Sequence, residues 1–394
     1  MNNKELIEKA VVTTDAIAST GKLNPVQSDR FLDLVVDITG LKGKVREVRF
    51  RGEQLDVDKI NVGRRVSVLR SEATATSIRR GVKTSKIKLN PVDVVTPFEI
   101  SSNFRMENIQ GESVEQTIIR MMSVATANDM EEMGLEGDKL GPAALESDVL
   151  DGGSSSDYVV DSYMGAQDGW LKLARSGHIV DAAGANISSN VFSKLIKAMP
   201  DKWRRVRRNI KFFLSTDHEQ NYRQTVSARA TAAGDVALST TQNLTPFGIE
   251  LVPLPLLQTR PKMVEHVTLT GTTPAALFST DVTNVVATLT TLGDTPTAPI
   301  AGSDLDVVEA AGTIARSGGS TLPDPVTVKV TYSSLGQVLS TEYRNLLMGL
   351  GRDVTILKDV DIYKDTHQYA IHSRFAYEVE EVDALALAKN VGLD

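Results

Sequence analysis

The chain has 394 residues, a formal net charge of −7 and no cysteine. The lack of cysteine excludes disulfides, thiolate metal sites and cysteine nucleophiles. The charged start, MNNKELIEKAVV, has no apolar stretch typical of a secretory signal, and no run approaches the roughly 18 apolar residues of a membrane helix. Proteins that grip duplex DNA across a broad face are normally basic, so the acidic balance argues against that class.

Residues 1–30 are polar with short apolar interruptions, which predicts an arm that is ordered only against a partner. The next run, Phe31 to Thr39, is apolar and β-branched and fits either a short helix or a strand.

From Val45 to Pro97 the pattern changes to period two, with glycines between alternating runs, as in strands joined by turns. Few apolar residues support a core, so a long polar hairpin reaching away from the body is expected. The segment is rich in basic residues, among them Arg64, Arg65, Arg70, Arg79, Arg80 and Lys83. Three interpretations remain open here: a solvated edge hairpin, a DNA-binding ribbon, or an arm that docks on a neighbouring subunit.

The strongest helix prediction covers residues 112–134. Ser113 and Gln116 have capping-box spacing, apolar side chains recur on one helical face, and Gly134 is placed to end the helix. About 20 residues at roughly 1.5 Å each give a rod of about 30 Å.

A loop is expected around residues 148–157, because its carboxylates lack the spacing of a calcium loop. A helix pattern follows from Tyr163 to Ser176, with Gly177 as its stop.

Residues 188–260 are predicted to form a separate α/β unit. A helix is expected from Ser188 or Ser189 to Met199, then strands over Ile210–Leu214 and Gly248–Pro255. Before the first of these strands lies a basic cluster, which indicates an exposed helix face or subunit contact more strongly than a nucleic-acid site, since no known binding motif accompanies it. Its members are Lys202, Arg204, Arg205, Arg207, Arg208 and Lys211.

Residues 285–344 are rich in Thr, Ala, Gly, Pro and Val, with a clear alternating strand from Val326 to Tyr332, and are interpreted as a small β insertion. Beyond them, alternation predicts a long strand over Tyr369–Val379. The closing run Asp383–Lys389, DALALAK, suits a short terminal helix.

No pattern in the chain predicts catalysis. The five histidines lack metal-ligand spacing, and neither a nucleophile elbow nor a phosphate-binding loop occurs. The sequence therefore predicts a non-enzyme without a cofactor or metal.

The C-terminal block resembles the major capsid proteins of tailed bacteriophages, which have the Hong Kong 97-like fold. The resemblance is carried by NLLMGLGRDVTI (345–356), by the alternating residues 368–379, and by DALALAKNV; Gly248–Pro255 and LFSTDVTN (277–284) also look like family segments. It implies an α+β fold in six parts. These are an N-terminal arm (1–30), a strand and extended E-loop hairpin (31–95), a peripheral domain (96–187) with the spine helix 112–134, an axial domain (188–284), the β insertion (285–344) and a return to the peripheral domain (345–394).

The resemblance further implies a shell protein that assembles through hexamers and pentamers around double-stranded DNA. The packaged DNA is a partner only by non-specific proximity. A separate scaffolding protein, a portal protein and a decoration protein are the other implied partners, with no membrane. The implied location is the virion, after assembly in the host cytoplasm. Arg64, Arg65, Arg70, Arg79, Arg80 and Lys83 become candidate subunit contacts. The alternative from a related fold is an encapsulin-type nanocompartment.

Overall fold

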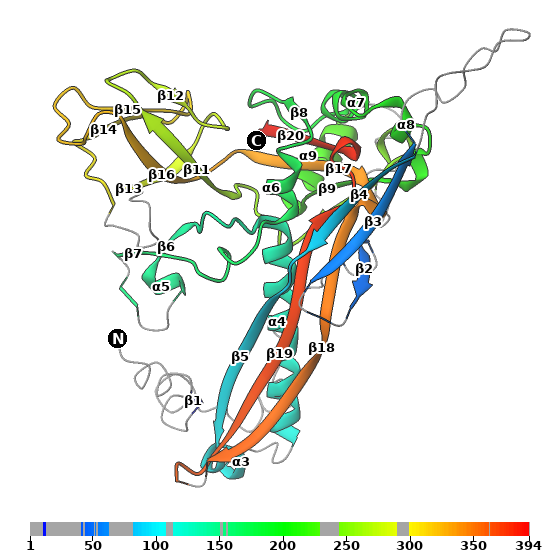
Figure 1. Ribbon diagram of the computed structural model, residues 1–394, viewed down its shortest axis with the longest axis vertical. Helices are drawn as coiled ribbons and strands as arrows, with labels where there is room; N and C mark the ends of the chain where they lie inside the picture. Colours follow the sequence, from blue (N-terminus) through cyan, green and yellow to red (C-terminus); the bar gives the residue numbers. More distant parts are fainter. Residues whose placement is uncertain are drawn as a thin grey trace, which may run out of the picture.

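The computed structural model describes residues 11–12, 41, 44–50, 52, 54–62, 82–107, 113–149, 153–154, 157–228, 244–289, 299–361 and 363–393. A lower sheet of long strands, an upper mixed sheet, a small β unit and a two-stranded ribbon are arranged around one long helix (Figure 1). This mixture of helices and strands agrees with the predicted α+β class. The arm 1–30, apart from Val11–Val12, and the run Phe31–Thr39 lie outside the described residues.

The lower sheet has five strands in the order β1-β5-β19-β18-β2. They span Val11–Val12 (β1), Val92–Ser101 (β5), Thr366–Val379 (β19), Leu346–Asp361 (β18) and Arg46–Arg49 (β2). The three long strands are antiparallel, whereas β1 and β2 pair in parallel at opposite edges. The strand predicted over Tyr369–Val379 is confirmed, and its buried residues alternate as expected.

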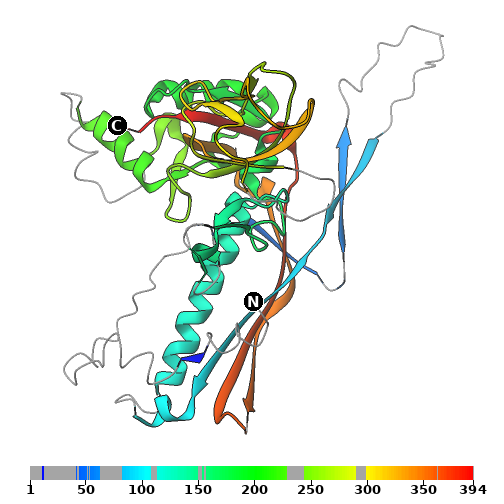
Figure 2. The same ribbon diagram turned by 90° about the vertical axis from the view of Figure 1, so that its left-hand side faces the viewer.

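Helix α4 spans Ser113–Glu136, which confirms the predicted spine helix and extends it two residues past Gly134. It runs along the lower sheet (Figure 2). In its first half, Ile118, Ile119 and Met122 pack against a cluster on β5 and β19 that includes Phe98 and Ile371. This apolar stripe holds the helix on the sheet.

The upper sheet has the order β10-β9-β17-β20-β8. Its strands span Glu250–Leu254 (β10), Ile210–Ser215 (β9), Gly336–Glu342 (β17), Leu385–Val391 (β20) and His178–Asp181 (β8). Helices α7 (Ser189–Ala198) and α9 (Thr216–Ser227) pack on it, with Phe192 and Tyr222 in contact in the core. The helix and both strands predicted between residues 188 and 255 are confirmed.

The terminal helix predicted over Asp383–Lys389 is wrong. Only Val382–Ala384 form a 3₁₀ turn (η5), and Leu385–Val391 form strand β20 between β17 and β8. Leu385, Ala386, Leu387 and Ala388 are all 0% exposed. A strand buried on both faces shows no alternation, so a Leu/Ala run gives no sign of its strand state.

The β unit consists of two three-stranded sheets, β11-β16-β13 and β12-β15-β14. Their strands span Lys262–Leu269 (β11), Val326–Ser333 (β16), Thr283–Leu289 (β13), Ala275–Ala276 (β12), Thr313–Arg316 (β15) and Leu305–Val308 (β14). This pairing does not follow the predicted limits of 285–344, because β11 begins before them and β17 pairs with the upper sheet. Alternation identifies strands but not their partners.

The other strands form two pairs: β3 (Leu55–Val62) with β4 (Val82–Leu89), and β6 (Ala143–Leu145) with β7 (Tyr158–Val160). The other helical segments are α3 (Ser102–Glu107), α5 (Glu146–Val149), α6 (Trp170–Ala174), α8 (Asp201–Arg204), η2 (Arg207–Asn209), η3 (Pro246–Gly248) and η4 (Tyr343–Asn345). The helix predicted over Tyr163–Ser176 forms only as α6. Before it, the Asp161 carboxylate accepts hydrogen bonds from the backbone N–H groups of Tyr163 and Met164, which holds a turn instead.

Helix α4 and strand β19 meet at a close contact. A Cβ added at Gly134 would lie 2.7 Å from Cε1 of Tyr377. The Tyr377 hydroxyl donates to the carbonyl oxygen of Met130, and its ring packs edge-on against Trp170. Glycine inside the helix is therefore required by the approach of the tyrosine ring.

Replacing Gly134 with alanine tests this contact. Alanine gains about 1 kcal/mol of helix propensity, but the clash with a buried ring costs about 1–3 kcal/mol. We expect G134A to lower the free energy of unfolding in urea titrations. G318A, where the added Cβ meets nothing within 4 Å, is the control and should change it by less than about 0.5 kcal/mol. Equal stability of G134A and the parent would show that Tyr377 can move aside.

Candidate subunit-contact surfaces

The β3–β4 ribbon projects away from the rest of the molecule (Figure 2). Its two faces differ because paired residues share a face. On one face Asp56 lies opposite Lys88 and Asp58 opposite Lys86, and all four side chains are exposed. The charges on this described part of the ribbon are therefore balanced across the strands.

The opposite face of the ribbon is apolar near its base. Leu55 pairs with Leu89 and Val57 with Ile87, and Leu89 is only 1% exposed. The prediction of a hairpin that is polar on both faces is therefore wrong at the base of the ribbon, where one face is covered by the body of the molecule. The alternation of apolar and polar residues in both strands could have indicated this apolar face.

Lys59 of the ribbon and Arg46 of β2 are both held to the loop between β19 and β20. Lys59 Nζ lies 2.7 Å from Glu381 Oε1 and also donates to the carbonyl oxygen of Glu380 at 3.1 Å. Arg46 Nη1 lies 2.9 Å from Glu380 Oε2. The side chains of Lys59 and Glu381 are 19% and 17% exposed, so their attraction is screened less than at an open surface.

Most of the predicted contact residues cannot be placed. Five of them, Arg64, Arg65, Arg70, Arg79 and Arg80, lie outside the described residues. Lys83 lies on β4 opposite Asn61. The role of these six residues as subunit contacts therefore remains a prediction.

A second surface, which the sequence analysis did not single out, lies at the far end of the β18–β19 pair. Ile356, Leu357, Val360 and Tyr363 are 42%, 53%, 46% and 102% exposed. β2 pairs with β18 only from Leu347 to Leu350, so beyond that point the outer edge of β18 has no partner strand in the described part of the chain. An apolar strand edge of this kind readily pairs with another chain.

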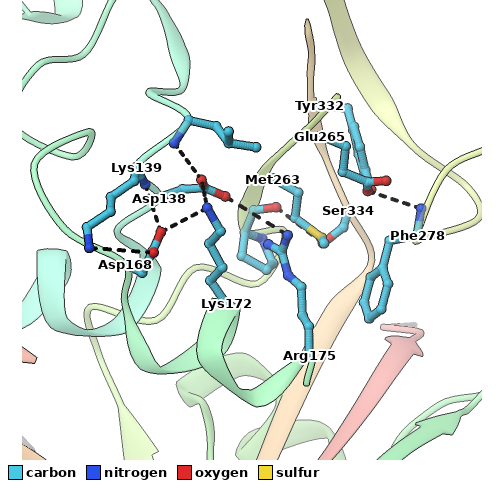
Figure 3. Close-up of polar contacts among 12 residues, drawn as sticks. Asp138, Lys139, Asp168, Lys172, Arg175, Met263, Glu265, Phe278, Tyr332 and Ser334 are labelled. Atoms are coloured by element: carbon cyan, nitrogen blue, oxygen red, sulfur yellow. Dashed lines mark hydrogen bonds and ion pairs between the residues drawn. The ribbon is translucent and has the colours of Figure 1, made fainter. Parts of the chain in front are cut away.

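A group of charged side chains joins helix α6 to the end of α4 (Figure 3). Lys172 contacts Asp138 and lies 2.8 Å from Asp168, while Arg175 Nη1 lies 4.0 Å from Asp138. Burial by itself raises the pKa of Asp168, but hydrogen bonds from Lys172 and from the backbone N–H of Lys139 outweigh it and lower that pKa.

The β unit is attached beside this group. The Arg175 guanidinium lies 5.6 Å from the centre of the Phe278 ring, and the Phe278 backbone N–H donates to Glu265. The Tyr332 hydroxyl also donates to Glu265 (Figure 3). From the other side, Lys329 Nζ donates to the carbonyl oxygen of Gly141 at 2.7 Å. The Arg175 and Lys329 contacts join the β unit to the end of α6 and to the loop after α4.

The described residues contain no group of three or more His, Asp or Glu side chains placed to hold a metal ion. The Ser215 Oγ lies 2.6 Å from His218 Nδ1, but the two residues are 2% and 1% exposed. Ser215 accepts from the backbone N–H of His218 as the N-cap of α9, and burial lowers the His218 pKa. This pair caps a helix and offers no access to a substrate. No helix in the described ranges is long and apolar enough to cross a membrane.

Glu136, at the end of α4, predicts a pH effect on stability. Burial raises the pKa of the Glu136 carboxyl to about 8, although a hydrogen bond from the Gln258 backbone N–H lowers it in part. Between pH 4.5 and about 8 the folded state therefore keeps a proton that the unfolded state has lost. The stabilisation by this group is complete below pH 4.5 and declines as the pH rises through about 8.

Glu136→Gln removes the titration and keeps an oxygen that can accept from Gln258. We expect the difference in unfolding free energy, variant minus parent, to grow from pH 5 to pH 8.5 in urea titrations. Glu309→Gln, at an exposed position in the β unit, is the control. A constant difference across this range would mean that Glu136 is already ionised in the folded state.

No family model matches the sequence, but one sequence relative and several solved structures are capsid proteins. The prophage capsid protein YqbE of Bacillus subtilis (strain 168) is 30% identical over 240 residues, which cover 60% of this chain and 71% of YqbE.

Solved capsids share the fold at lower identity. The capsid of a native GTA particle matches with a TM-score of 0.51 and 13% identity, over 97% of this chain and 100% of that one. The satellite phage P4 procapsid, solved with its size determination (Sid) protein, matches with a TM-score of 0.51 and 11% identity, over 90% of this chain and 88% of that one. From the sequence relative and the shared fold together, the chain belongs to the capsid-protein family of tailed bacteriophages and their prophages.

Proposed function

We propose that this chain is a major capsid protein that self-assembles through hexamers and pentamers into the icosahedral shell enclosing a tailed phage's double-stranded DNA. The family relationship carries this proposal, and the fold match to a capsid along nearly the whole chain supports it. The encapsulin-type alternative is not favoured, because the sequence relative is a prophage capsid protein. The role is structural rather than catalytic.

Two surfaces of the described chain suit such assembly. The β3–β4 ribbon extends from the body, and an isolated two-stranded ribbon is only marginally stable in water. The outer half of β18 exposes an unpaired apolar edge. Each contact with a neighbour is weak, but each subunit makes several at once in a closed shell, so release requires breaking them together.

The proposed partners follow from that role. They are further copies of the chain, a separate scaffolding protein during assembly, a portal protein, a decoration protein, and packaged DNA by non-specific proximity only. The net charge of −7 limits attachment to the polyanion. The proposed location is the virion, after assembly in the host cytoplasm.

Expression of the full chain with the scaffolding protein encoded beside it tests the proposal. We expect closed shells by electron microscopy and a fast-sedimenting fraction in density gradients. A chain that stays monomeric at high concentration with its scaffolding protein present would contradict the shell function.

The predicted contact residues have a separate test. We expect simultaneous replacement of Arg64, Arg65, Arg79 and Arg80 by alanine to lower the assembled fraction, because attraction to acidic surfaces on neighbours is lost. The circular dichroism of the subunit should not change. The matched control is K194A/K197A, at two exposed positions of α7. If the arginine variant assembles as well as the control, these residues are not subunit contacts.

A further inference from the structure

The basic cluster before β9 is divided by the fold into paired and unpaired members. Arg204 pairs with Asp201, and Lys211 pairs with Glu250. The remaining four, Lys202, Arg205, Arg207 and Arg208, are exposed, and none has a carboxylate within ion-pair distance in the part of the chain that the structure describes. Four unpaired cations thus lie within seven residues of an acidic protein.

Apolar side chains are exposed among these cations. Val206 is 51% exposed and Phe247 is 47% exposed. Phe247 lies beside the segment, because Arg207 Nη1 donates to its carbonyl oxygen at 3.4 Å. We name Lys202, Arg205, Val206, Arg207, Arg208 and Phe247 the 202–208 patch.

The backbone at Phe247 is strained. Its φ of 55° lies in the left-handed region, which is costly for a bulky side chain. The strain does not serve to bury the ring, since almost half of the residue is exposed. Residues held in strained backbone conformations cluster at ligand-binding and switch sites.

The neighbouring carboxylates do not neutralise the patch, because they already have partners. Glu250 accepts from Lys211 and Lys44, and these contacts lower its pKa to about 2. Asp201, next to Lys202 in the chain, pairs with Arg204. Among the described residues, no carboxylate is therefore left to compensate the charge of the patch.

We propose that the 202–208 patch binds an acidic amphipathic segment of a second protein, with its carboxylates on the four cations and its apolar side chains over Val206 and Phe247. A duplex phosphate backbone would satisfy the cations but leave both apolar side chains in a polar environment. An amphipathic segment covers both kinds of surface. The proposal does not depend on shell assembly, because the patch is complete within one subunit.

The test uses the full-length subunit and fluorescence anisotropy. The probes are a labelled helical peptide with Glu on one face and Leu on the other, the same peptide with Leu replaced by Ser, and a short DNA duplex. We expect the Glu/Leu peptide to bind most tightly, and R205E/R208E to weaken it by about tenfold or more. K364E, at an exposed lysine at the far end of the β18–β19 pair, is the control and should leave binding unchanged.

Phe247→Asn separates binding from folding. Asparagine adopts positive φ more readily than phenylalanine, so unfolding free energy should be unchanged or higher while peptide affinity falls severalfold. Failure of the Glu/Leu peptide to bind at low salt would overturn the proposal, as would equal binding of the duplex or of the Ser peptide. Self-association that R205E/R208E abolishes would also overturn it, since the partner would then be another copy of the chain.

Discussion

The seating of helix α4 on strand β19 is the constraint on which the rest of the structure depends. Gly134 lets the Tyr377 ring lie against the helix backbone, and the tyrosine hydroxyl donates to Met130. Gln167 also stabilises β19 at this contact. Its side-chain N–H donates to the Phe375 carbonyl oxygen, and its side-chain oxygen accepts from the Tyr377 backbone N–H. Since Gln167 is 4% exposed, these buried polar groups satisfy one another. A long helix and a long strand, far apart in sequence, are thereby held as one rigid spine.

The two sheets are coupled through this spine. β18 and β19 belong to the lower sheet, whereas β17 and β20, which flank them in the sequence, belong to the upper sheet. The chain therefore passes from the upper sheet to the lower one and back within its last part. Trp170 stabilises the end of β19, where the chain leaves the lower sheet, because its ring nitrogen donates to the Glu378 carbonyl oxygen at 3.2 Å. For a shell protein, such coupling would transmit a load on the lower strands to the upper sheet.

Charge is used differently at the joints and at the surface. Within the molecule, Asp138 and Asp168 face Lys172 at a half-buried junction where screening is weak. On the ribbon, opposite charges pair across the exposed strands and leave little net attraction. The 202–208 patch is the contrast, because its cations remain exposed without carboxylate partners in the described structure. An unpaired basic surface on an acidic protein is better suited to selecting a partner than to stabilising the fold.

The sequence by itself determined the local elements whose patterns follow directly from backbone geometry. The long helix, α7, and strands β9, β10, β16 and β19 were readable because each is apolar on one side only or is bounded by clear stop signals. The exposed basic cluster before β9 was also visible, as was the order of segments that identified the family. Tertiary structure alone decided that Leu385–Val391 is a central strand rather than a helix, because burial on both faces erases the period that distinguishes the two. It also decided which sheet each strand joins and which cations remain unpaired, since both depend on partners that are distant in sequence and that no local pattern encodes.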